Sequence, residues 1–103
     1  MEKLKGFQNK YLKGLAHGIK PVVFIGHKGM TPEVARAVDE ALDIHELIKV
    51  KFIDFKEKSL KEEIAGVIEK ETASALVGMI GHMAIYYRQQ KDPEKRKIVL
   101  PRR

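Results

Sequence analysis

An apolar run, a glycine-flanked loop and a helix start follow one another at residues 21–32, Pro21-Val22-Val23-Phe24-Ile25-Gly26-His27-Lys28-Gly29-Met30-Thr31-Pro32. The continuous run Pro21–Ile25 predicts a short strand that is buried on both faces, with helices packed above or below it. Thr31 and Pro32 are typical of the N-cap and the first residue of a helix. This stretch therefore predicts a strand that turns through Gly26–Met30 directly into a helix.

Before this stretch, apolar residues recur at helical spacing: Leu4, Phe7, Tyr11, Leu12 and Leu15. They predict an amphipathic helix over residues 3–16, with Gly18 as its stop signal. The opposite arc of this helix would carry four side chains that are basic or can become so: Lys3, Lys10, Lys13 and His17.

Beyond the loop, the second helix is expected to end near His45, and residues 47–53 alternate as a strand. Ser59 and Glu62 predict a capping box at the start of a third helix. Two strands, Ala75–Ile80 and Met83–Arg88, have the spacing of a β-hairpin. The order α-β-α-β-α-β-β predicts an α/β (α+β) fold with a mixed four-stranded sheet and three helices. Residues 97–101 would add a short edge segment.

Composition fits a single domain over residues 1–103 with a basic C-terminal tail at about residues 89–103. The net charge is +6, and its distribution along the chain is uneven. Residues 1–20 hold five Lys and one Glu, and residues 88–103 hold seven Lys or Arg and two acidic residues, whereas the middle has an acidic excess. Basic ends favour a polyanionic partner, because neutralising phosphates releases counterions. Charge that only confers solubility on frayed termini is the alternative.

The Gly26-His27-Lys28-Gly29 loop has the clearest binding chemistry. Its two glycines allow positive φ and let a ligand approach the backbone closely. The helix start beyond Thr31 offers unpaired N–H groups and the positive end of a dipole to a phosphate. This is the design of the GXXG loop that clamps nucleic-acid backbone in KH domains. An ordinary tight turn between strand and helix is the alternative, because a lone G-x-x-G is a weak signal.

Other side chains could extend that contact. The basic arc of the first helix carries no acidic residue, which favours a phosphate-contacting ridge over the commoner solvated helix face. Lys20 follows this helix, and Arg88 ends the last strand. Lys49 and Lys51 would either line the open face of the sheet or protect an edge strand against aggregation. Tyr86 and Tyr87 alternate faces, so we expect one in the core and the other free to stack on a base.

Residues suited to catalysis are few. The four histidines, His17, His27, His45 and His82, have neither i, i+4 spacing nor a carboxylate pattern for a metal site. Asp39 and Asp43 lie one turn apart on the outward face of the second helix, where a solvated cluster is expected. The absence of cysteine excludes disulfides and thiolate metal sites. We therefore expect no enzyme, no metal or cofactor and no small-molecule substrate.

Neither a signal peptide at residues 1–6 nor an apolar stretch of about 20 residues is present, so we expect a soluble, cytoplasmic protein without a membrane partner.

Taken in order along the chain, the motifs resemble the CRM domain (chloroplast RNA splicing and ribosome maturation) in its bacterial free-standing, YhbY-like form. The matching pieces are Leu12-Lys13-Gly14-Leu15-Ala16-His17, Lys20-Pro21-Val22-Val23, Gly26-His27-Lys28-Gly29-Met30-Thr31, His45-Glu46-Leu47-Ile48-Lys49-Val50-Lys51, Ile80-Gly81, Tyr87-Arg88 and Lys97-Ile98-Val99-Leu100-Pro101. The longer Gln89–Glu94 segment departs from the shorter members of the family.

This resemblance implies a fold like the C-terminal domain of bacterial initiation factor three. It also implies binding to ribosomal RNA and association with the immature large ribosomal subunit, a pre-ribosomal particle, through the basic GxxG loop. The expected RNA-binding residues are Gly26, His27, Lys28, Gly29, Thr31, Lys3, Lys10, Lys13, His17, Lys20 and Arg88.

Two other functions remain open at this stage. One is a protein-interaction module that docks on a ribosomal protein or an assembly GTPase through the acidic face of the second helix. The other is a small RNA-processing enzyme that uses His27 as an acid or base.

Overall fold

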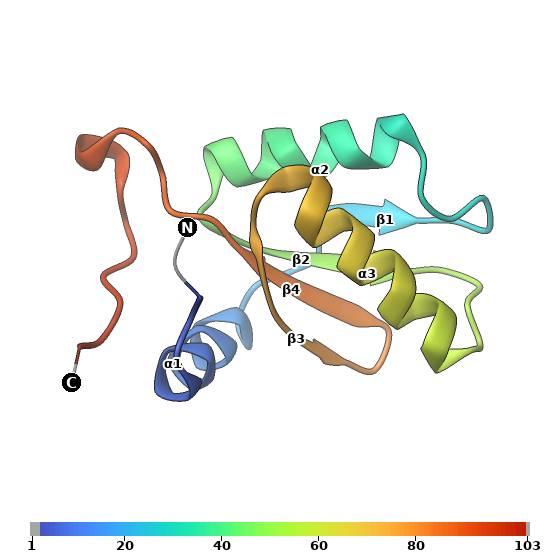
Figure 1. Cartoon of the computed structure of the whole chain (residues 1–103), viewed down its shortest axis with the longest axis horizontal. Helices are drawn as coiled ribbons and strands as arrows, with labels where there is room; N and C mark the ends of the chain where they lie inside the picture. The colour runs from blue at the N-terminus through green and yellow to red at the C-terminus, as the bar shows by residue number, and fades with distance from the viewer. Residues whose placement is uncertain (1–2, 103) are drawn as a thin grey trace.

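The computed structural model describes residues 3–102 and confirms the predicted order of helices and strands (Figure 1). The elements are α1 (Gly6–Ala16), β1 (Val23–Ile25), α2 (Pro32–Ile44), β2 (Leu47–Phe52), α3 (Lys58–Thr72), β3 (Ala75–Ile80), β4 (Met83–Tyr87) and a short 3-10 turn, η1 (Pro93–Lys95). None of the helices within residues 3–102 is long and apolar enough to cross a membrane.

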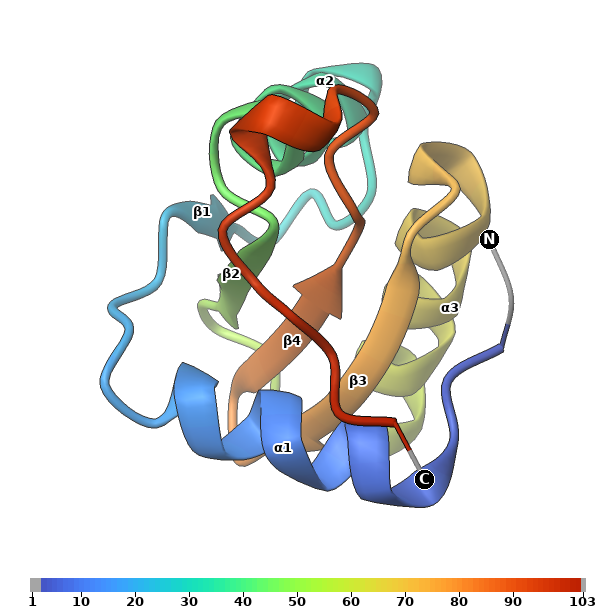
Figure 2. The ribbon, with the colours of Figure 1, turned by 90° about the vertical axis from the view of Figure 1, so that its left-hand side faces the viewer.

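The four strands form one mixed sheet in the order β1-β2-β4-β3. β1 is parallel to β2, and β4 lies antiparallel between β2 and β3. Both crossovers, β1-α2-β2 and β2-α3-β3, join parallel strands and progress in the same direction across the sheet. Because such crossovers share one hand, they bring α2 and α3 to the same face. α1 lies on the other face (Figure 2).

The larger core lies between the sheet and the α2/α3 layer. Val23, Ile25, Ile48, Val50 and Phe52 from β1 and β2 are buried there, because alternate strand residues point to this face. They pack against Val38 and Leu42 of α2 and against Ile64 and Ile68 of α3. The apolar residues that recur at helical and strand spacing in the sequence thus form one buried layer.

A second, smaller core lies under α1. Leu12 and Ala16 of α1 cover Leu47, Val77, Ile85 and Tyr87 of the sheet. The last strand therefore buries both of its tyrosines, Tyr86 under α3 and Tyr87 under α1. The prediction that one of them is free is wrong, because helices cover both faces at this end of the sheet.

The first strand is not buried on both faces, which corrects the sequence-based prediction. α1 packs against β2, β3 and β4, and it leaves the outer face of β1 uncovered. Val23 and Ile25 are buried, whereas the Phe24 side chain between them is 53% exposed. Burial on the second face would need a partner element that this fold does not put there.

The residues after η1 form no edge strand, contrary to the prediction. They cross the α1 side of the sheet as an extended segment and end beside α1 (Figure 2). The buried Glu46 carboxylate anchors this segment by accepting hydrogen bonds from the backbone amides of Gln90, Lys97 and Ile98, at 2.9, 2.7 and 2.9 Å. Ile98 and Leu100 then pack against the smaller core.

Two helix starts differ from the prediction. α1 begins at Gly6 rather than at residue 3, because the Gln8 side chain accepts a hydrogen bond from the Lys5 backbone N–H at 2.9 Å and fixes the first turn there. α3 begins at Lys58, with Glu57 as its N-cap residue, so Ser59 already lies inside the helix. The predicted Ser59–Glu62 capping box is therefore absent.

Candidate nucleic-acid interface

The predicted glycine loop is a tight turn that links β1 to α2. The Gly29 N–H donates to the Gly26 carbonyl oxygen at 2.9 Å and closes the turn. Gly29 has a φ of 69°, in the left-handed region that glycine adopts without a Cβ penalty. Gly26 does not have positive φ, so only one of the two glycines is required by the backbone conformation. A Cβ at Gly26 would meet no atom within 4 Å, which leaves its backbone open to a ligand.

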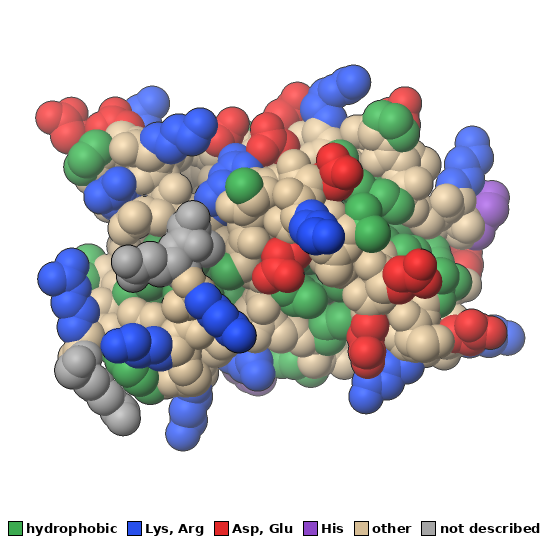
Figure 3. All heavy atoms as spheres, in the orientation of Figure 1, with side chains coloured by type: hydrophobic (Ala, Val, Ile, Leu, Met, Phe, Trp, Pro, Cys, Tyr) green, Lys and Arg blue, Asp and Glu red, His purple; other side chains and the backbone are tan. Residues whose placement is uncertain are grey.

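Gly29 also seats the turn on the protein core. It is buried, and a Cβ built on it would lie 3.5 Å from Ile64 Cδ1 and 4.0 Å from Phe55 Cζ. The two residues at the tip, His27 and Lys28, are exposed instead. Basic and histidine side chains stand out at the end of the molecule from which this turn projects (Figure 3). A fixed turn thus presents two nitrogen-bearing side chains to solvent.

The start of α2 lies directly behind the turn, as predicted. The Thr31 hydroxyl accepts a hydrogen bond from the Val34 N–H at 3.2 Å, and Pro32 occupies the first turn. The helix dipole places partial positive charge at this end. Glu33 in the first turn offsets part of that charge, so His27 and Lys28 carry the greater share of any attraction for a phosphate.

The turn borders a shallow hollow of about 320 Å³ on its α3 side. Met30, Phe55, Leu60 and Val67 give this hollow an apolar lining, and Glu63 adds a carboxylate to its wall. Apolar and acidic side chains lie together on the α3 surface in Figure 3. His27 and Lys28 also line this hollow, so the carboxylate of Glu63 offsets part of their attraction for a polyanion on this side of the turn.

The α1 side of the sheet has a different charge. Lys10 and Lys13 of α1 and Lys51 of β2 are exposed, as are His17 and Lys20 beyond the helix. α1 and the four strands contain no acidic residue, and no salt bridge within residues 3–102 involves these lysines. β2 is an inner strand of the sheet, so the alternative of edge protection by Lys49 and Lys51 is wrong.

Lys13 does not lie on the arc of α1 that faces away from the sheet. Its side chain extends across Gly78 of β3, where a Cβ would come within 2.5 Å of Lys13 Cε. The absence of a side chain at residue 78 therefore lets this lysine cross the sheet surface. Along the long axis of the molecule, the loop lies at one end and α1 lies toward the other (Figure 1).

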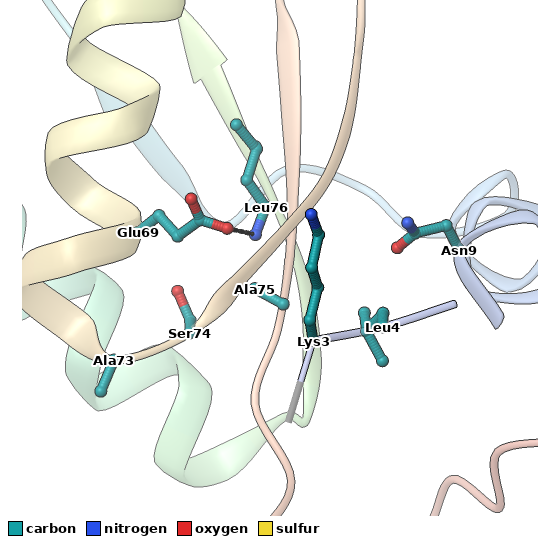
Figure 4. Close-up of a pocket in the computed structure, with 8 residues that line it drawn as sticks. All are labelled: Lys3, Leu4, Asn9, Glu69, Ala73, Ser74, Ala75 and Leu76. Atoms are coloured by element: carbon teal, nitrogen blue, oxygen red, sulfur yellow. Dashed lines mark hydrogen bonds between the residues drawn. The ribbon is translucent and has the colours of Figure 1, made fainter. Parts of the chain in front are cut away.

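Lys3 does not join the α1 lysines, because the helix starts three residues later. It lines a separate hollow together with Asn9 and with Glu69, Ser74 and Ala75 from the α3–β3 connection (Figure 4). The Glu69 carboxylate accepts a hydrogen bond from the Leu76 N–H in the same place. The structure thus separates Lys3 from the other predicted RNA contacts.

Arg88 is also separated from them. Its guanidinium forms salt bridges with Asp39 at 2.6 Å and Asp43 at 2.9 Å, and it donates to the Thr72 carbonyl oxygen at 2.8 Å. Its side chain is only 17% exposed. Arg88 therefore joins the end of β4 to α2 and α3, and the two aspartates are ion-paired rather than a simply solvated cluster.

The two tyrosines of β4, Tyr86 and Tyr87, are buried and offer no stacking surface. Tyr86 donates its hydroxyl to the Ala65 carbonyl oxygen at 2.8 Å. Burial and the nearby Glu69 charge raise its pKa well above the ordinary value. Burial and the Glu46 charge also raise the pKa of Tyr87. Within residues 3–102, no group of three His, Asp or Glu side chains is arranged to hold a metal ion.

Sequence reasoning missed one aromatic side chain on this surface. Phe24 lies on the outer face of β1, two residues before the glycine turn, and its Cα partner in β2 is Lys51. Its position in a continuous apolar run concealed its exposure. The shortness of the run could have indicated this exposure, because a short strand is covered by few neighbours. The strand itself has only three residues.

Three comparisons place the chain among known proteins. Residues 4–88 match the family model described as the CRS1 / YhbY (CRM) domain. An RNA-binding protein of Haemophilus influenzae is 42% identical over 103 residues, which is all of both chains. A probable RNA-binding protein of Bacillus subtilis is 33% identical over 98 residues, 95% of this chain and 99% of its own.

The fold has a solved counterpart in Staphylococcus aureus. The solution structure of a hypothetical protein from this organism superposes with a TM-score of 0.80 at 35% identity, and the match covers 96% of this chain and all of the other. Together with the family model, these full-length matches confirm the resemblance inferred from the motifs. The chain belongs to the CRS1/YhbY (CRM) domain family.

Proposed function

We propose that this protein binds RNA and holds the sugar–phosphate backbone with its glycine turn, residues 26–29. The observation that carries the proposal is the construction of this turn. Gly29 fixes it on Ile64 and Phe55, and His27 and Lys28 extend from it into solvent at the start of α2. Donors held in advance around an uncovered backbone suit a phosphate, which carries charge but little shape.

The lysines of the α1 side supply a second contact for the same strand. Lys10, Lys13, Lys20 and His17 lie on or just beyond α1, where neither the helix nor the sheet contributes a carboxylate. Phosphate contacts add affinity without sequence preference, and their number sets the salt dependence of binding. Thr31 contributes indirectly, because its hydroxyl fixes the helix start behind the turn.

The RNA in this proposal is ribosomal RNA within the immature large ribosomal subunit. The resemblance to the free-standing bacterial form of the CRM domain supports this choice, since it implies association with that particle. The names of the Haemophilus influenzae and Bacillus subtilis relatives support RNA as the partner class. The acidic face of α2 is a weaker basis for a protein-docking function, because Arg88 neutralises Asp39 and Asp43.

Filter binding of structured ribosomal RNA to a His27→Ala, Lys28→Ala variant tests the loop. We expect the variant to bind about tenfold more weakly and to show a shallower salt slope, because at least one phosphate contact is lost. A His45→Ala, Lys70→Ala variant is the matched control, since it removes the same residue types from exposed positions, one directly after α2 and one on α3. Equal affinity of the loop variant and the wild type would exclude the turn from the interface.

Co-sedimentation with ribosomal particles tests the proposed target. The wild type should migrate with the precursor of the large subunit, and the loop variant should remain near the top of the gradient. Co-sedimentation of the loop variant that also survives nuclease treatment would instead show a protein contact.

A further inference from the structure

The uncovered part of the α1 side contains a row of side chains that crosses all four strands. The strand register pairs Phe24 with Lys51, Lys51 with Met83, and Met83 with Ile80. Each of these residues is next in sequence to one that points into the α2/α3 core, so all four point to the opposite face. We call this set the open row.

The two ends of the open row are apolar and exposed. Phe24 is 53% exposed and Ile80 is 58% exposed, while Met83 is partly buried between them. Single exposed apolar residues are common and need no explanation. Here, however, a phenyl ring and two further apolar side chains lie in one line across the sheet, and no helix or strand within residues 3–102 covers Phe24 or Ile80.

The charge around the open row is cationic. Lys51 is a member of the row, and Lys13 reaches over Gly78, two residues before Ile80. Lys49 lies one position further toward α1 on the same face. The four strands and α1 contribute no carboxylate here, and Asp54, beyond the end of β2, is the acidic residue that lines the neighbouring surface with Lys51 and His82.

An aromatic surface surrounded by lysines suits unpaired bases on a phosphate chain. Every base has a π face that can stack on an aromatic ring, and the lysines can neutralise the flanking phosphates. Phe24 lies two residues before Gly26, so the open row adjoins the turn that is proposed to hold the backbone. The hollow on the α3 side of the turn is lined by His27 and Lys28 too, but it also contains the carboxylate of Glu63, whereas the open row contains no carboxylate.

From this juxtaposition we infer that the open row is a stacking site for unpaired RNA bases, with Phe24 as the stacking ring and Lys51 and Lys13 as the phosphate contacts. The inference rests on the proposed RNA-binding function and extends it: the glycine turn holds backbone, and the open row selects single-stranded over fully paired RNA.

A single-stranded ten-nucleotide RNA, labelled with fluorescein, is the probe for this site. Phe24→Ala should lower the affinity about tenfold, in the range that removal of one aromatic stacking partner gives, with an unchanged salt slope because no charge is lost. Phe24→Trp should retain wild-type affinity or exceed it. Ile44→Ala, which removes an exposed apolar side chain from the end of α2, is the matched control and should bind as the wild type does.

A second RNA with abasic sites separates stacking from other effects. Loss of the bases should weaken binding by the wild type and leave binding by Phe24→Ala almost unchanged, because that variant has already lost the stacking partner. Equal weakening of both proteins would overturn the inference, as would equal affinity of the wild type for the single strand and its fully paired duplex.

The loop variant distinguishes this inference from the proposed function. Normal binding by Phe24→Ala together with weak binding by His27→Ala, Lys28→Ala would overturn the stacking site and leave the turn as the RNA contact. If a Leu60→Ala, Val67→Ala variant lost the dependence on bases instead, the bases would lie in the α3 hollow and the open row would be excluded. If the wild type did not bind RNA, both the stacking site and the proposed function would be excluded.

Discussion

The two faces of the sheet carry similar folding chemistry and opposite charge chemistry. On the α2/α3 face, the two helices contain eight acidic and four basic residues, and their acidic groups take part in all the salt bridges found within residues 3–102. On the α1 face, the helix and the strands contain four lysines and no carboxylate. The α2/α3 face thus has an acidic excess and contains the salt bridges, whereas the charge of the α1 face is entirely positive.

This difference shows which cations of the chain are structural. Arg88 carries the same charge as Lys13, but it is largely buried and bound to two aspartates and a backbone carbonyl. Lys13 crosses an open surface without an ion pair. A cation that stabilises the fold is recognised by its partners, and a cation without a partner on a carboxylate-free face raises the local positive potential.

Charge reversal on the two faces should have the largest effect and tests the comparison directly. We expect a Lys13→Glu, Lys51→Glu variant to lose about a hundredfold in RNA affinity at moderate salt, or roughly 3 kcal/mol, because two attractions become repulsions. A Lys58→Glu, Lys70→Glu variant on α3 has the same net charge and should lose far less. Filter binding at several salt concentrations measures both, and equal losses would mean that only net charge matters.

Removal of Arg88 should lower stability without changing RNA binding. Arg88→Ala leaves the Thr72 carbonyl unpaired and removes two ion pairs, whose aspartates are more than half exposed. We expect a loss of about 2 kcal/mol in the free energy of unfolding, measured in urea. Arg36→Ala, on the same helix α2, should change it little. If the Arg88→Ala variant folded but bound RNA more weakly, Arg88 would be an RNA contact after all.

Acid should release the C-terminal segment from the α1 face, a smaller effect. Burial raises the pKa of Glu46, but the amides of Gln90, Ile98 and Lys97 and the charge of Arg96 outweigh it, and the net pKa lies below the usual range. A depressed pKa contributes stability above the unfolded pKa of about 4.3, and this is lost as the pH falls through the folded value.

The amide resonances of Lys97 and Ile98, followed by NMR, should therefore shift as the pH falls below the unfolded pKa of about 4.3. In Glu46→Gln these shifts should be absent, and the stability at pH 7 should be about 1–2 kcal/mol lower, because hydrogen bonds to a charged acceptor are weakened. An unchanged pH profile in this variant would show that another carboxylate controls the segment.

Local sequence patterns were sufficient for most of the fold. Apolar periodicity, apolar runs and hairpin spacing predicted the helices and strands, and Thr31 and Pro32 predicted the start of α2, because these signals act over a few residues. The Ser59–Glu62 capping box is the exception: Glu57 is the N-cap residue of α3, so the helix starts two residues before the predicted cap.

Features set by distant contacts could not be predicted. Whether Phe24 is covered depends on how far α1 reaches across the sheet, and the fate of Tyr87 depends on the same helix. Arg88 looked like a free cation because its partners, Asp39 and Asp43, precede it by more than forty residues. The exposure of His27 and Lys28 was predicted correctly, since a glycine turn rarely hides its tip.

In the proposed RNA complex, the packing of Gly29 on Ile64 and Phe55 has a kinetic consequence. Since the chain orders this turn when it folds, an incoming strand encounters a contact whose conformational entropy has already been lost, and little is left to lose on association. The long-range field of the lysines governs how often the strand arrives, and the rigidity of the turn governs how long it stays. Residence time, rather than arrival, is the quantity that the packing beneath the glycine controls.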